Sequence, residues 1–108
     1  MLKQNKEIKF IKGENYLPRN KKEKVLVSTF LKLKTEQEMA NFLRDLLTIA
    51  EIEEFANRLE MGRLLLKGWS YKRISKEIGV STTTVTRVAH WLFKGCGGYW
   101  KTFIKKEI

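Results

Sequence analysis

The chain has 108 residues, 43% of them hydrophobic and 11% aromatic, so it can build a core and is not a disordered polymer. Its net charge of +10 is carried by residues 1–24 and 67–108, whereas residues 25–66 have a small acidic excess. One cysteine cannot form an internal disulfide, which fits a reducing cytoplasm, and no apolar run approaches the length of a membrane span. We expect one all-helical cytoplasmic domain that meets an anionic partner such as nucleic acid, and not a membrane.

Residues 1–21 are expected to form a basic N-terminal arm, because they mix charge with isolated apolar side chains and contain Gly13 and Pro18. The arm either touches phosphate or is a solvated terminus, and both interpretations stay open. A helix is expected over residues 22–33, where Leu26 and Phe30 belong to a stripe of apolar residues three and four positions apart.

Two T-x-x-E pairs, which begin at Thr35 and Thr48, have the spacing of helix capping boxes. They predict helices over residues 35–47 and 49–67. The first of these helices has one apolar face, as an amphipathic helix should.

The helix over residues 49–67 has a broader apolar surface than one neighbour needs, so a second copy of the chain is expected to share the core. We therefore interpret residues 22–68 as dimerisation helices. Gly62, inside the long helix, costs about 1 kcal/mol relative to alanine and is expected to admit a close helix crossing.

Residues 69–94 are expected to fold as a helix-turn-helix. Ser70 can cap the first helix, Gly79 can end it with a positive φ, and Ser81 can cap the second helix. The residues at helical spacing that would pack this segment are Ile74, Ile78, Val80, Val85, Val88 and Leu92. A structural helical hairpin has the same apolar spacing and stays open as the plainer interpretation.

The outward positions of this segment carry hydroxyl and basic side chains, and Glu107 is the one acidic residue after Gly79. Threonine is a mediocre helix former, so a cluster of exposed threonines indicates contact with phosphate, base edges or thymine methyl groups. The lysines are expected to contact phosphate, although a simply solvated helix face would look similar. The predicted DNA-binding residues are Lys72, Lys76, Ser81, Thr82, Thr83, Thr84 and Thr86.

Residues 95–108 begin with a glycine-rich connection, GCGG, and are expected to end in a C-terminal helix. Its apolar residues need a surface to bury them: Tyr99, Trp100, Phe103 and Ile104. With this helix, the chain is expected to contain about six helices and no strand.

Three stretches carry a family resemblance: LLTIAEIEEFANRLEMGRLLLKG, SYKRISKEIGVSTTTVTRV and GCGGY. Together they resemble the Trp repressor superfamily, and more closely its YerC/YecD-type branch, over residues 35–99. The resemblance implies an intertwined homodimer of TrpR-like helix-turn-helix subunits. Each subunit would present one reading head to successive major grooves of double-stranded DNA.

The resemblance also implies an effector site at Thr48, Arg58 and Arg87, where the Trp repressor binds L-tryptophan between its long helix and its second reading helix. Val88 stands where that repressor has glycine, and a β-branched side chain there can fill the space of the ligand. Trp91, one turn after Arg87, can also occupy this space. A small-molecule corepressor other than L-tryptophan, or no effector, is therefore expected.

Enzymatic function is not expected, because no spacing supports a nucleophile or an acid/base pair. His90 is expected on the surface, and Cys96 alone does not make a metal site. The sequence predicts a sequence-specific DNA-binding transcriptional regulator, expected to repress, that binds an inverted-repeat operator as a dimer. The alternative is a helical dimer that binds another protein and no DNA, which would show no gel shift and little dependence on salt.

Overall fold

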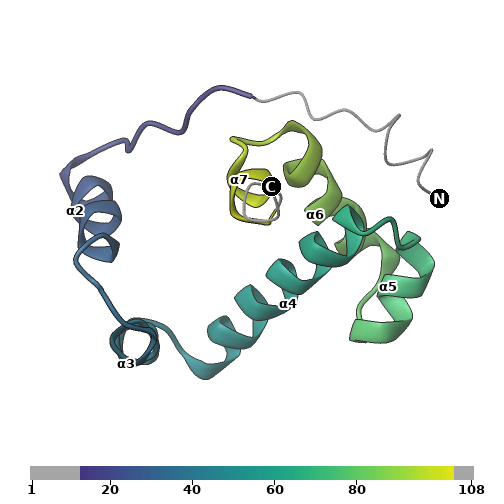
Figure 1. Cartoon of the computed structure of the whole chain (residues 1–108), viewed down its shortest axis with the longest axis horizontal. Coiled ribbons are helices and arrows are strands. Elements are labelled where there is room, and N and C mark those ends of the chain that lie inside the picture. Colours follow the sequence, from purple (N-terminus) through teal and green to yellow (C-terminus); the bar gives the residue numbers. More distant parts are fainter. Residues whose placement is uncertain (1–12, 104–108) are drawn as a thin grey trace. The chain divides into compact units, whose positions relative to one another are not determined.

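The computed structural model describes residues 13–103, which form helices joined by turns and contain no strand (Figure 1). The helices are α2 (Lys21–Phe30), α3 (Glu36–Leu46), α4 (Ile49–Leu66), α5 (Tyr71–Ile78), α6 (Thr82–Lys94) and α7 (Gly98–Phe103). The predicted all-α class with about six helices is thus confirmed over the described part of the chain. The predicted contribution of Ile104 to the last helix lies outside these residues. Within residues 13–103, no helix is long and apolar enough to cross a bilayer.

The two predicted T-x-x-E pairs open helices α3 and α4, and the pair at Thr48 forms the complete capping box, whereas Glu38 accepts the amide one residue before the cap. The Thr35 hydroxyl accepts the Glu38 amide at 3.1 Å, and the Glu38 carboxylate accepts the Lys34 amide at 2.8 Å. At the start of α4, the Thr48 hydroxyl accepts the Glu51 amide at 3.1 Å, and the Glu51 carboxylate accepts the Thr48 amide at 2.9 Å. Both threonines therefore satisfy amides that a helix start leaves without partners.

Helix α2 differs from the prediction at both ends. It begins at Lys21 because Asn20, a cap that the sequence analysis missed, accepts the Glu23 amide at 3.0 Å. It ends at Phe30 because the next three amides, those of residues 31–33, bond to carbonyls three residues back at 3.0–3.3 Å. The tighter turn stops the helix three residues before its predicted end.

The described residues fall into two compact units, and α4 runs from one into the other. The unit of residues 16–55 contains no buried residue in α2 or α3, although the rings of Phe30 and Phe42 meet edge to face at 5.8 Å. Many of its large apolar side chains are exposed, including Val25, Leu26, Val27, Phe30, Leu46, Ile49 and Phe55.

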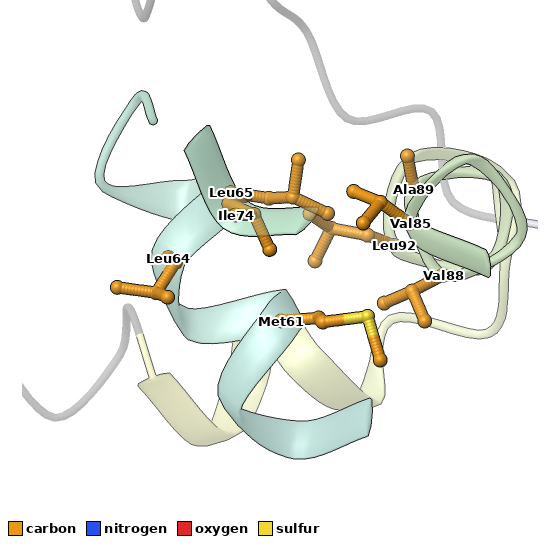
Figure 2. Close-up of a cluster of buried hydrophobic side chains, with 8 residues drawn as sticks. All are labelled: Met61, Leu64, Leu65, Ile74, Val85, Val88, Ala89 and Leu92. Atoms are coloured by element: carbon orange, nitrogen blue, oxygen red, sulfur yellow. The ribbon is translucent and has the colours of Figure 1, made fainter. Parts of the chain in front are cut away.

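The other unit contains residues 13–15 and 56–103 and holds the core. Figure 2 shows the side chains that meet there: Met61, Leu64 and Leu65 from α4, Ile74 from α5, and Val85, Val88, Ala89 and Leu92 from α6. Ile74, Val85 and Leu92 are 0% exposed, so the helix-turn-helix is packed on the C-terminal half of α4. Met61, Leu64 and Ala89 are core residues that the apolar spacing in the sequence did not indicate.

Candidate nucleic-acid interface

The first helix of the helix-turn-helix, α5, starts at a cap and a stacked arginine. The Ser70 hydroxyl accepts the Arg73 amide at 3.1 Å, as predicted from the sequence. The Arg73 guanidinium lies 3.6 Å from the centroid of the Trp69 ring. This cation–π contact holds Arg73 against the protein, so Lys72 and Lys76 are the α5 cations with extended reach to a ligand.

The turn between α5 and α6 is closed around Ser75. Gly79 has φ 84° and ψ 37°, the left-handed conformation predicted for it. Its amide and that of Val80 donate to the Ser75 carbonyl oxygen at 2.9 Å and 3.1 Å, while the Ser75 hydroxyl donates to the Val80 carbonyl. The carbonyl and the hydroxyl of Ser75 therefore join the last turn of α5 to the residue that follows Gly79.

The second helix of the helix-turn-helix, α6, begins with a chain of hydroxyl groups. Ser81 accepts the Thr84 amide at 3.2 Å, and the two hydroxyl oxygens lie 3.1 Å apart. The Thr86 hydroxyl donates to the Thr82 carbonyl oxygen at 2.9 Å, which leaves its lone pairs and its methyl group for a ligand. Thr82 and Thr83 are exposed, and within residues 13–103 their hydroxyls bond to no side chain.

The packing of the buried side of the helix-turn-helix determines which of its residues face solvent. Ile74 on α5 and Val85 on α6 are fully buried, and the two helices approach each other closely. The seven predicted DNA-binding residues lie in or next to these two helices: Lys72, Lys76, Ser81, Thr82, Thr83 and Thr86 are exposed, and Thr84 is half-buried.

The charge of this surface is almost entirely positive. Helix α6 contains no acidic residue, and Glu77 is the one acidic residue of α5. The ion pairs Arg19–Glu23 and Arg63–Glu60 lie outside the helix-turn-helix. Over the described chain, the exposed cations Lys72 and Lys76 are thus not neutralised by a carboxylate of the protein, and they are available to phosphate.

The three predicted effector residues lie on different elements of the chain. Arg58 and Arg87 are exposed on α4 and α6, whereas Thr48 lies in the other compact unit and caps α4. Val88, which was predicted to fill ligand space, is 6% exposed and packs in the core. Trp91, the other residue expected to occupy this space, is 61% exposed.

Two further reactive side chains, those of His90 and Cys96, lie on the surface of the described chain. His90 is exposed, as predicted, and its ring meets the Trp91 ring edge to face at 5.1 Å. Cys96 is exposed and unpaired. In the described part of the chain, no three His, Cys, Asp or Glu side chains gather as metal ligands would.

The sequence matches the family described as Trp repressor protein over residues 21–107. It is also 42% identical over 74 residues to a protein of Bacillus subtilis (strain 168) described as Uncharacterized protein YerC. The matched stretch covers 68% of the present chain and 71% of that relative. The structure is similar to the crystal structure of a TrpR like protein from Eubacterium eligens ATCC 27750, with a TM-score of 0.78 and 30% sequence identity. The similarity covers 83% of the present chain and 93% of that one.

Proposed function

The chain belongs to the Trp repressor family, in its YerC branch, and on that premise we propose that it is a sequence-specific DNA-binding transcriptional regulator. The observation that carries the proposal is the two-sided helix-turn-helix. Its apolar side is buried against α4, while its outward side offers lysine and threonine side chains and a cation excess. This family consists of non-enzymatic regulators, and we propose repression as the outcome of binding.

We propose that phosphates and bases are contacted by different residues of this surface. Lys72 and Lys76 on α5, with the N-terminal amides of α6 next to Ser81, would hold the DNA backbone and set the register. The edge formed by the exposed Thr82, Thr83 and Thr86 and the half-buried Thr84 would enter the major groove and read base edges and thymine methyl groups.

We propose that two copies bind DNA together. The many large apolar side chains exposed on α2, α3 and the N-terminal half of α4 support this step, because exposed apolar surface is what a protein partner would bury. In this proposal residues 22–68 are dimerisation helices, 69–94 the DNA reader, 95–108 a C-terminal helix and 1–21 a basic arm. A two-fold dimer requires an operator with inverted half-sites about 10 base pairs apart.

The effector site at Thr48, Arg58 and Arg87 is part of the proposal. Because the Val88 side chain is buried where the Trp repressor has glycine, we propose an effector other than L-tryptophan, or none. Thermal-shift measurements against amino acids and related metabolites separate these outcomes. A concentration-dependent rise in Tm identifies an effector, and a rise with L-tryptophan would contradict the argument from Val88.

Fluorescence anisotropy with a labelled duplex, titrated over a range of salt concentrations, tests DNA binding. The proposal predicts that the logarithm of the association constant falls linearly with the logarithm of salt concentration, because bound lysines release counterions. Absence of binding in dilute buffer would reject the proposal and favour the alternative of a protein–protein interaction module.

A further inference from the structure

The C-terminal helix α7 contacts the long helix α4 through Tyr99. The Tyr99 ring lies so close to Gly62 that a Cβ built on Gly62 would stand 2.6 Å from Tyr99 Cε1 and 2.7 Å from Cδ1. The Tyr99 hydroxyl donates to the Arg58 carbonyl oxygen at 3.5 Å, one helical turn before Gly62. Glycine at position 62 is therefore what lets the ring lie on the backbone of α4.

The next residue, Trp100, contacts the recognition helix α6. Its indole N–H donates to the Leu92 carbonyl oxygen at 2.7 Å, and its ring lies 6.4 Å from that of Phe93. Leu92 is in the last turn of α6, where carbonyls lack helical partners, so the indole also completes the end of this helix.

The glycine turn between α6 and α7 is itself held in place. A Cβ on Gly95 would collide with the Trp91 carbonyl oxygen, and Gly97 has φ 91°. The Gly13 amide donates to the Gly95 carbonyl oxygen at 2.8 Å. The turn therefore directs α7 back onto the protein, which places Tyr99 and Trp100 at their two contacts.

We propose that Tyr99 and Trp100 form an aromatic clamp that holds the recognition helix at a fixed orientation on α4, and that both are positioning residues for DNA recognition. This inference rests on the proposed function. The two residues are adjacent on one short helix, so α4 and α6 cannot rotate relative to each other without breaking one of the two contacts. Burial raises the pKa of Tyr99 above its usual 10.0, against the opposite effect of the Arg58 charge, so the hydroxyl stays a neutral donor.

The contact between Gly62 and Tyr99 can be tested without DNA. Alanine favours helix more than glycine does, so Gly62→Ala should raise Tm unless the ring obstructs the new methyl group. The three atoms nearest to that methyl all belong to Tyr99. We expect Gly62→Ala to lower Tm in the wild-type chain and to raise it in a Tyr99→Ala chain. A change of the same sign in both backgrounds would overturn the clamp.

The positioning role is tested by DNA affinity, measured by anisotropy with a mixed-sequence duplex at a temperature where every variant is folded. We expect Tyr99→Ala and Trp100→Phe to weaken binding about tenfold, and Tyr99→Phe, which keeps the ring, to stay within about twofold of wild type. Thr102→Ala, an exposed change on the same helix, is the matched control and should bind as wild type does.

The Gly62→Ala/Tyr99→Ala double variant separates positioning from stability. Its Tm should exceed that of Tyr99→Ala while its DNA affinity stays reduced, because the added methyl stabilises α4 without restoring the clamp. Recovery of affinity together with Tm would overturn the positioning role, as would wild-type affinity in Tyr99→Ala. If the wild-type chain binds no DNA, the proposed function is rejected. The opposite effects of Gly62→Ala on Tm in the wild-type and Tyr99→Ala chains would still decide whether the clamp exists.

Discussion

At the scale of single residues, the exposed lysines and threonines have different expected effects on binding. Lys72 and Lys76 present charge from α5, whereas the threonines present hydroxyl and methyl groups from the first turns of α6. A phosphate contact adds affinity for every sequence and increases the dependence on salt, whereas a base contact changes the order of preference among sequences. The two classes can therefore be separated by mutation.

Replacement of Lys72 by alanine should weaken binding to all duplexes alike and reduce the salt slope by about one, because one fewer phosphate is neutralised. Salt titrations of Lys72→Ala and of the wild-type chain measure this change. Lys101→Ala, which removes the same charge from an exposed position on α7, is the control. An unchanged slope in Lys72→Ala would remove Lys72 from the DNA contacts.

Replacement of Thr83 by alanine should change sequence preference, since Thr83 is exposed near the start of the recognition helix. A lost base contact costs about 1–3 kcal/mol at the affected base pair and little elsewhere. Competition among duplexes that differ at single positions measures the effect. If every duplex loses affinity equally, Thr83 does not contact a base.

At the scale of elements, the turn between α5 and α6 depends on the backbone conformation of Gly79. Gly79 has a positive φ, and a Cβ there would meet no atom within 4 Å, so alanine would suffer backbone strain without a collision. Gly79→Ala should lower the free energy of unfolding by about 1–2 kcal/mol. Gly98→Ala is a matched control, because Gly98 also has open space around it and lacks a positive φ. Denaturant melts that show equal stability for both variants would contradict the role of the turn.

The start of α2 predicts a dependence of stability on acid. The Arg19 guanidinium and amide, then the Tyr16 hydroxyl, donate to Glu23 and lower the pKa of its carboxyl from 4.5 to about 2. Because the folded pKa is the lower one, this stabilisation is complete above pH 4.5 and is lost as the pH falls toward 2.

Thermal melts of the wild-type chain and Glu23→Gln over this range measure the effect. The difference in Tm between the wild-type chain and Glu23→Gln should be constant above pH 4.5 and should disappear near pH 2. Arg19→Ala removes the largest cause of the shift and should shrink the difference. A gap that does not change with pH would show that the Glu23 contacts do not stabilise the folded chain.

At the scale of the whole molecule, the two compact units differ in how much of their apolar surface is buried within a single chain. Leu31 is 81% exposed and Ile49 60%, whereas Ile74, Val85 and Leu92 have no exposed surface. The helix-turn-helix unit therefore has its own core, and the unit of α2 and α3 does not. This contrast is what supports the proposed dimer.

The features of this structure that depend on residues close together in the sequence were predictable from the sequence. Ser70, Gly79 and Ser81 act within a few positions of themselves, so capping and turn rules identify them. The contact of Tyr99 with Arg58 joins residues 41 positions apart, and no local pattern indicates it. The face of α4 that packs on α6, marked by Met61, was missed because its helix is apolar on several sides.

Selection of bound fragments from a pool of random duplex DNA tests the central claim most directly, since it reports binding, specificity and symmetry together. We predict enrichment of an inverted repeat whose half-sites lie about 10 base pairs apart, one for each helix-turn-helix of a dimer. A pool that is not enriched, or one enriched only in single half-sites, would contradict the account.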